Sequence, residues 1–183
     1  MDRRDFLKTV AVSGAAMTIQ RSEAMEILTQ AVNSTGKPDL VAVMGDEPEL
    51  MFQRAIAELG GMKQFVKSGQ KVVVKPNIGW DKVPELAGNT NPKLVAEIVK
   101  QCFAAGAKEV TVFDHTCDDW QKCYKNSGIE SAAKAAGAKV MPAHLESYYR
   151  PVDLSKGKNM KKAKIHEAIL NCDVWINVPI LKN

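Results

Sequence analysis

The 183-residue sequence lacks the short motifs that would identify its chemistry directly. Its four cysteines form no C-x-x-C pair, so no zinc knuckle or iron–sulfur motif is encoded in this chain. It contains neither a G-x-G-x-x-G nor a Walker sequence, which weakens a nucleotide-binding interpretation. A strong charge of one sign is also lacking, because the net charge is only +4. These absences leave the cofactor unknown and argue against nucleic acid as a partner.

Long apolar runs are lacking as well, but the N-terminus resembles an export signal. Asp2-Arg3-Arg4-Asp5-Phe6-Leu7-Lys8 resembles the twin-arginine pattern R-R-x-F-L-K. The apolar stretch that follows, Thr9 to Ile19, is too short for a bilayer span of roughly 20 residues, and Ser22-Glu23-Ala24 supplies small residues for cleavage. The pattern predicts a signal peptide over residues 1–24, with the twin-arginine translocase as a partner and a periplasmic or other extracytoplasmic location. The alternative is an ordinary N-terminal helix with a chance arginine pair.

The rest of the chain alternates between strand-like and helix-like patterns. Residues 25–38 read as a polar linker, and residues 39–183 read as one α/β domain. Strands are expected at Leu40–Met44, Lys71–Lys75, Glu109–Phe113, Lys139–Met141 and Val174–Val178. Helices are expected at Glu47–Leu59, from Thr90 or Asn91 to Gly106, and at Ile129–Ala136. Because the unbroken valines 72–74 are typical of a strand buried on both faces, the pattern predicts a three-layer sandwich with a mostly parallel sheet.

A different pattern precedes the last strand. Two strand-like segments, Tyr148–Leu154 and Met160–Ile165, flank Gly157 and predict an antiparallel excursion. A short helix is expected near His166–Leu170. Lysines and one arginine concentrate in this region, and we favour a solvated hairpin face over docking to an acidic partner or to anionic lipid.

Candidate ligand-binding residues follow the ends of the expected strands. In open parallel sheets, ligands bind beyond the carboxyl ends of the strands. The candidates selected by this rule, together with the start of the following helix, are Lys75, Asn77, Asn91, Asn177 and Lys182. A cation, amides and free helix N–H groups suit a small anionic ligand such as a phosphate or carboxylate. The alternative is a lysine whose head reaches solvent and an asparagine that fixes a turn.

The loop after the third strand holds the candidate catalytic residues. Asp114 and His115 are the only close acid–base pair found in the candidate loops, and Asp114 directly follows a central strand. His115, Cys117 and Cys123 are candidate metal ligands. Two alternatives remain open for the cysteines: a disulfide between Cys117 and Cys123, or no special role. Cys102 and Cys172 read as small core residues, and Trp175 is expected in the core.

Several segments together resemble a known family. They are Val72-Val73-Val74-Lys75-Pro76-Asn77-Ile78-Gly79-Trp80, Thr90-Asn91-Pro92, Ala105-Gly106-Ala107-Lys108-Glu109-Val110 and Asp173-Val174-Trp175-Ile176-Asn177-Val178-Pro179. The set resembles the N-terminal half of the domain of unknown function 362 family, from about Asp39 onward. The resemblance implies a twin-arginine signal, which members commonly carry, and an association with iron–sulfur proteins, because some members carry a ferredoxin-like domain. It implies no established activity.

Two functional interpretations follow from these residues. The first is a periplasmic, redox-associated enzyme that acts on a small anionic molecule at the strand ends. The second is a non-catalytic binding or maturation protein that holds a cofactor or partner in the same crevice. The family usually continues beyond Asn183, and no helix follows the last strand. We therefore expect a domain truncated at its C-terminus, with a bare sheet face beside this strand, and either self-association or a missing C-terminal segment.

Overall fold

The computed structural model describes residues 38–180, and the chain divides into two units, Met1–Pro38 and Asp39–Asn183. The expected signal peptide and Lys182 lie outside the described residues. The helices of the second unit are α3 (Pro48–Glu58), α4 (Pro92–Ala105), α5 (Trp120–Asn126), α6 (Ile129–Ala135) and α7 (Glu167–Leu170), with 3₁₀ turns η2 (Met62–Gln64), η3 (Pro84–Leu86) and η4 (Glu146–Tyr148). None of the helices in the described part of the chain has the length and apolar character to cross a membrane.

Four parallel strands form the main sheet, as the valine-rich pattern predicts. They are β1 (Lys71–Pro76), β2 (Glu109–Val112), β3 (Lys139–Val140) and β6 (Val174–Val178), in the order β3-β2-β1-β6. The chain moves from β1 to β2 to β3 and then crosses to the other side of β1. The strand order therefore reverses between β1 and β6, a place where open α/β sheets commonly bind ligands.

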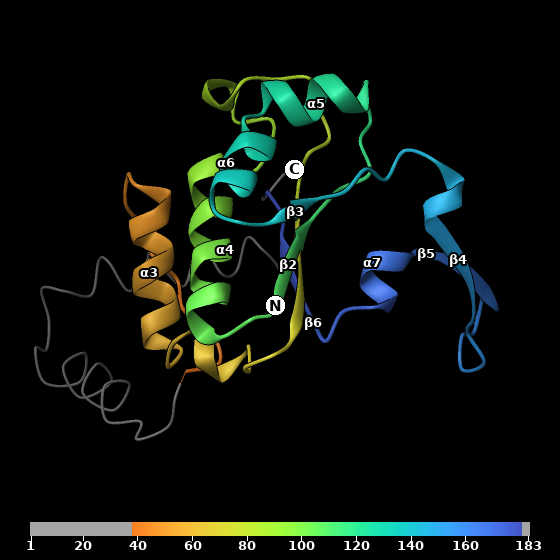
Figure 1. Cartoon of the computed structure of the whole chain (residues 1–183), viewed down its shortest axis with the longest axis horizontal. Coiled ribbons are helices and arrows are strands. Elements are labelled where there is room, and N and C mark those ends of the chain that lie inside the picture. Colours follow the sequence, from red (N-terminus) through yellow and green to blue (C-terminus); the bar gives the residue numbers. More distant parts are fainter. Residues whose placement is uncertain (1–37, 181–183) are drawn as a thin grey trace, which may run out of the picture. The chain divides into compact units, whose positions relative to one another are not determined.

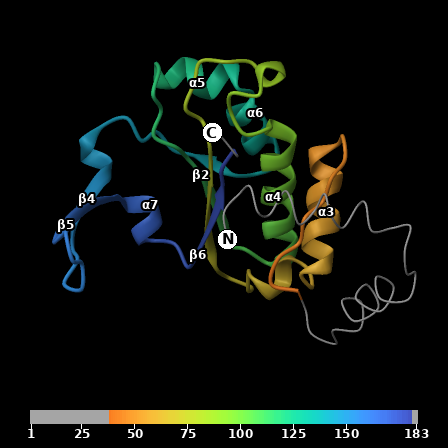
Figure 2. The ribbon, with the colours of Figure 1, turned by 180° about the vertical axis from the view of Figure 1, so that it is seen from behind.

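Side chains alternate between the two faces of this sheet and build two cores. On one face, valines of β1 and β2 pack against α4 and α6, and α3 contacts α4. On the opposite face, Val73 and Phe113 pack with Ala143 and residues of α7. Figures 1 and 2 show α4 and α6 on one side of the sheet and α7 on the other. The sheet thus lies between helices on both faces, and the predicted α/β architecture is confirmed, although only the short α7 covers the second face.

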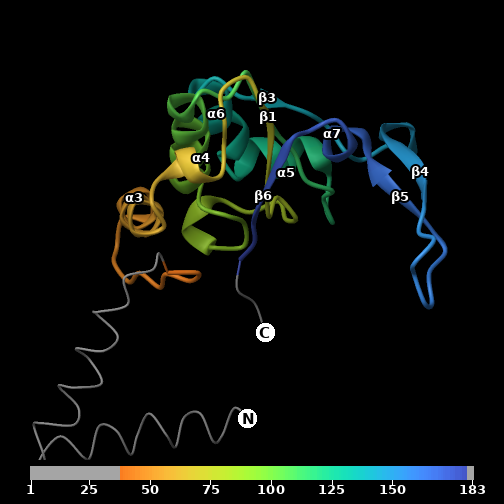
Figure 3. The same ribbon diagram turned by 90° about the horizontal axis from the view of Figure 1, so that it is seen from below.

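A two-stranded antiparallel sheet stands apart from the main sheet. It consists of β4 (Tyr149–Asp153) and β5 (Lys162–His166), and it extends away from the main sheet beyond α7 (Figure 3). The predicted antiparallel excursion and the short helix after it are confirmed. Arg150 pairs with Glu167 and Lys164 pairs with Glu146, so two of the basic side chains of this hairpin are neutralised locally.

Two local predictions are wrong, and one helix was not predicted from the sequence. Residues 40–44 form no strand, and Leu40 and Met44 are 84% and 95% exposed. The polar residues after Asp119 form the helix α5, because the Asp119 side chain accepts a hydrogen bond from the backbone N–H of Lys122 and caps it. Trp175, which we expected in the core, is 52% exposed.

Candidate functional site

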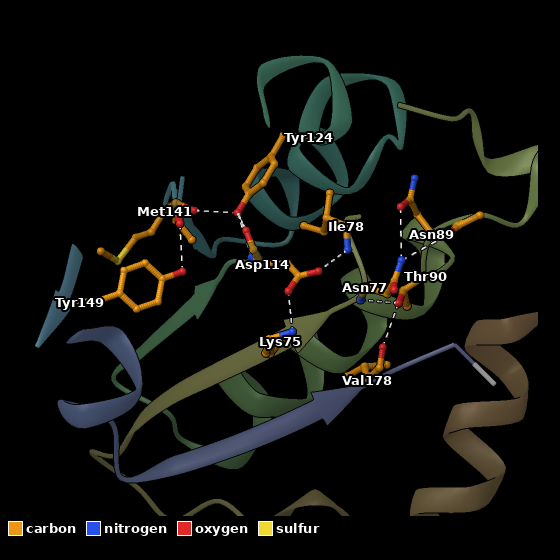
Figure 4. Close-up of polar contacts among 12 residues, drawn as sticks. Lys75, Asn77, Ile78, Asn89, Thr90, Asp114, Tyr124, Met141, Tyr149 and Val178 are labelled. Carbon is orange, nitrogen blue, oxygen red and sulfur yellow. Dashed lines mark hydrogen bonds and ion pairs between the residues drawn. The ribbon is translucent and has the colours of Figure 1, made fainter. Parts of the chain in front are cut away.

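An ion pair joins the ends of the two central strands. The Lys75 ammonium in β1 lies 2.5 Å from Oδ1 of Asp114, two residues beyond the end of β2. The other carboxylate oxygen, Oδ2, accepts a hydrogen bond of 2.8 Å from the backbone N–H of Ile78 (Figure 4). The Asp114 side chain is 8% exposed, whereas that of Lys75 is 32% exposed. Asp114 is therefore a buried anchor, and Lys75 is the member of the pair that reaches solvent.

Tyr124 of α5 fixes the backbone that carries Asp114. Its buried hydroxyl accepts a 2.8 Å hydrogen bond from the Asp114 N–H, and the carbonyl oxygens of Asp114 and Met141 lie within 3.0 Å to accept its proton (Figure 4). Burial raises the pKa of this phenol far above its usual value, so the hydroxyl stays protonated. One side chain thus ties α5 to the carboxyl end of β2 and to the segment after β3.

The loop between β1 and α4 is closed by its own polar side chains. The Asn77 amide donates to the carbonyl of Gly88, and the Asn77 backbone N–H donates to the Thr90 hydroxyl at 2.8 Å. That hydroxyl donates in turn to the carbonyl of Val178, at the end of β6 (Figure 4). Asn91 caps α4 by accepting from the N–H of Lys93. The structure therefore gives Asn77 and Asn91 backbone-fixing roles in this loop and at the helix start.

A hollow of about 320 Å³ lies beside the ion pair, on the sheet face that carries α7. Lys75, Phe113, His115 and Trp175 line it from the main sheet and the loop after β2. Tyr149, Lys164, Ile165 and His166 of the hairpin and Ile169 of α7 complete the wall. Asp114 is not among the lining residues, so Lys75 is the member of the ion pair that contributes to the wall of the hollow.

His115 is the member of the predicted catalytic pair that reaches this hollow. Its ring is exposed and lies edge-on to Tyr149, with the ring centroids 6.3 Å apart. The Tyr149 hydroxyl donates to the carbonyl of Ala143, which holds the ring in the wall. Burial, and then the charge of Asp114, raise the pKa of Tyr149, so its phenol remains neutral. Of the predicted catalytic pair, His115 therefore lines the hollow, whereas Asp114 contacts Lys75 and does not line it.

Asn177 lies next to Lys75 in the sheet. The two residues are partners in the parallel register of β1 and β6, and their side chains share the face that carries the hollow. Asn177 is exposed there. Of the predicted ligand-binding residues, the structure therefore brings Lys75 and Asn177 together, and it places Asn77 and Asn91 in the neighbouring loop and helix cap.

Cys117 and Cys123, the candidate metal ligands or disulfide pair, lie in different environments. Cys117 is exposed, Cys123 is buried, and both are free, so the disulfide alternative is wrong. Burial raises the pKa of Cys123, which keeps its thiol protonated, and the thiol points to the carbonyl of Gly79. Within residues 38–180, no three His, Cys, Asp or Glu side chains converge in a group that could hold a metal ion. The structure thus does not bring His115, Cys117 and Cys123 together as a ligand set.

His166 forms the part of the wall that sequence reasoning missed. It is 2% exposed and stacks on Phe113 at a ring-centroid distance of 4.0 Å. Nδ1 accepts a 3.1 Å hydrogen bond from the N–H of Ala168 and caps α7, and Nε2 lies 3.2 Å from the carbonyl of Pro142. These contacts fit the neutral ring with its proton on Nε2. One sequence signal could have identified this role of His166. A short helix is expected to start there, and the residue before a helix often caps it.

We expect the stability of the fold to depend on the protonation of His166. Burial lowers its pKa in the folded state, which leaves it below the unfolded value of about 6.5. The unfolded chain then binds the extra proton more readily, so the contribution is fully present above that value and is lost as pH falls below it. The free energy of unfolding is measured in urea at pH 7.5 and at pH 5.0. Between these two pH values, His166→Asn should lose less stability than the wild type loses. Parallel losses in the two proteins would contradict this prediction.

Comparison with known proteins gives a family but no characterised relative. No curated protein and no solved structure matches the chain. The family model that matches covers residues 72–183, more than half of the sequence, and includes the ion pair, the hollow and β6. This protein therefore belongs to the family described as "Domain of unknown function (DUF362)".

Proposed function

We propose that this protein binds a small anionic molecule at the carboxyl edge of its sheet, with Lys75 as the cation that contacts the negative charge. One observation carries the proposal: Lys75 lines the hollow, its side chain is partly exposed, and its ammonium is held by a buried carboxylate. A positioned cation loses less side-chain freedom when an anion binds than a mobile surface lysine does. Asn177, its exposed neighbour in the register, supplies an amide on the same face.

The test compares two lysines of the same strand. Binding of acetate, benzoate and inorganic phosphate is measured by isothermal titration calorimetry for the wild type, Lys75→Gln and Lys71→Gln. A hydrogen bond to a charged group contributes about 1.5–3 kcal/mol, so Lys75→Gln should weaken the bound anion by at least about tenfold. Lys71→Gln is the matched control, because Lys71 is exposed at the other end of β1 and does not line this hollow. Equal affinities for the wild type and Lys75→Gln would refute the proposal.

We favour an enzyme, redox-associated as the family resemblance implies, over a non-catalytic binding protein. His115 supports the enzyme, because it lines the hollow and has a titratable ring within the wall that holds Lys75. One observation favours the binding protein: both carboxylate oxygens of Asp114 are occupied, so Asp114 is not free to act as a base. Asp114 then serves either function by positioning Lys75.

Substitution of His115 separates the two functions. Each anion that binds is incubated with the protein, and products are sought by mass spectrometry. For an enzyme, His115→Gln should remove turnover and keep the affinity, whereas His144→Gln should change neither, since His144 lies outside this hollow. Binding without turnover in the wild type would favour the cofactor- or partner-binding function.

Export through the twin-arginine route is the second half of the proposal. It rests on Arg3 and Arg4 and the apolar stretch behind them. Replacing both arginines with lysine keeps the charge but should abolish export, which is measured by fractionating cells that produce the full chain. Unchanged export of the double variant would show that the arginine pair is not an export signal.

A further inference from the structure

The wall of the hollow is almost wholly apolar, although a cation lies at its border. Five of the nine lining side chains are aromatic rings: Phe113, His115, Tyr149, His166 and Trp175. Ile165 and Ile169 add aliphatic surface, and the remaining two residues are lysines. A bare inorganic anion would leave most of this surface in contact with water. The lining therefore matches a molecule with an apolar body and one charged group.

Trp175 provides the most exposed apolar surface of this wall. It lies on β6 beside Val73 in the register, so its side chain projects from the same sheet face as Lys75. Its exposed fraction of 52% contrasts with the burial of Val73, its neighbour in the register, and of Phe113, which also lines the hollow. An aromatic side chain that is half exposed at the edge of a hollow offers a flat surface for a second ring.

The charges around the hollow favour a negative group. Lys75 and Lys164 line it, whereas their partner carboxylates, Asp114 and Glu146, do not. Both lysines thus contribute to the wall of the hollow, whereas neither of their partner carboxylates does. The volume of about 320 Å³ lies at the lower end of the usual range for small-molecule sites, about 300–1,000 Å³.

We propose that the ligand is an aromatic monoanion, such as a one- or two-ring carboxylate, with its ring against Trp175 and its charge at Lys75. This inference rests on the proposed anion site at Lys75 and adds the class of molecule that occupies it. The ring of the ligand contacts Trp175 on one side and the hairpin wall of Tyr149 and Ile165 on the other. A bare phosphate has no apolar surface to place against this wall.

The experiment uses three probes that separate the ring from the charge. They are 2-naphthoate, which has both, acetate, which has only the charge, and 2-naphthalenemethanol, which has only the rings. Affinities are measured by calorimetry for the full chain and for Trp175→Ala, Trp175→Phe and Lys75→Gln. The Trp175→Phe variant is the matched control, because it keeps an aromatic face at the same place.

We expect 2-naphthoate to bind at least about tenfold more tightly than acetate. Trp175→Ala should weaken 2-naphthoate about tenfold, and Trp175→Phe should weaken it less. Lys75→Gln should weaken 2-naphthoate but leave the neutral alcohol unchanged. This pattern would establish both the ring contact and the charge contact.

Other outcomes overturn the inference in distinguishable ways. Equal affinity for acetate and 2-naphthoate, with no effect of Trp175→Ala, would refute the aromatic body and leave the anion site standing. A loss with Trp175→Ala but none with Lys75→Gln would support the ring contact and refute the proposed function. No binding of any probe would overturn both. Dimerisation in analytical ultracentrifugation that Trp175→Ala abolishes would assign the hollow to a second copy of the chain, and would also overturn the inference.

Discussion

Asp114→Ala should lower the free energy of unfolding by about 2–4 kcal/mol. The substitution removes the acceptor of the buried Ile78 N–H and the partner of the Lys75 ammonium in one step. A buried donor without a partner costs about 1–3 kcal/mol, and separating a largely buried ion pair adds to that cost. Hydration of the unpaired Lys75 ammonium offsets part of this loss of stability, because the Lys75 side chain is already 32% exposed. Urea unfolding, monitored by circular dichroism, measures the difference.

Two variants control this measurement. Asp114→Asn removes the charge but keeps an oxygen that can accept from the Ile78 N–H, so it should cost about half as much. Asp153→Ala, at an exposed position of the hairpin, should stay within about 0.5 kcal/mol of the wild type. If Asp114→Ala were as mild as Asp153→Ala, the carboxylate would not be the anchor that its burial and contacts indicate.

Tyr124→Phe should lower the free energy of unfolding by about 1–3 kcal/mol, although it removes a single oxygen atom. The hydroxyl lies between the N–H of Asp114 and the carbonyls of Asp114 and Met141, and the residue is 2% exposed. Without the hydroxyl, the Asp114 N–H has no acceptor there, and water cannot easily replace it in a buried position. The backbone that aims Asp114 at Lys75 would also lose its tie to α5.

The matched control is Tyr148→Phe. The Tyr148 ring is half buried and contacts the rings of His144 and His166, and those contacts do not require its hydroxyl. Tyr148→Phe should therefore change the free energy of unfolding by no more than about 0.5 kcal/mol. Anion binding gives a second readout for Tyr124→Phe. If the hydroxyl positions the Lys75–Asp114 pair, the variant should bind the anion more weakly than the wild type at every pH tested. Equal stabilities of the two variants would count against this assignment.

The order of elements in the domain could be predicted from the sequence because its central strands are strongly patterned. The unbroken valines of β1 predict a strand with cover on both faces, and Asn91 followed by Pro92 predicts the start of α4. Both signals are local and agree with the tertiary structure. The run Leu40–Met44 shows the limit of this reasoning. A strand needs a neighbour to pair with, and residues 40–44 pair with none of the strands in the described part of the chain.

The candidate site was predictable in part, because parallel strands bring their carboxyl ends to one edge. That rule selects Lys75 and Asp114, and the structure places them in contact. It does not say which of them faces solvent, since this depends on burial by Ile78, Tyr124 and the loop before α4. The rule also does not select the hairpin residues that line the hollow, such as Tyr149 and His166. They come from a separate sheet, and no periodicity specifies how it packs against β1.

The position of β6 in the sheet also sets the order in which the domain can form. Lys71 at the start of β1 and Asp173 just before β6 are joined by a hydrogen bond, yet they are 102 residues apart in the sequence. Contacts between residues so far apart in the sequence form late in folding. The conformational entropy of the intervening chain must be lost before strand pairing contributes any stabilising free energy. At a synthesis rate of about 5–20 residues per second, roughly 5 to 20 s pass between the emergence of β1 and that of β6 from the ribosome. During that interval one edge of the valine-rich strand β1 is open to other chains, so we expect the nascent domain to be most prone to aggregation before its last strand arrives.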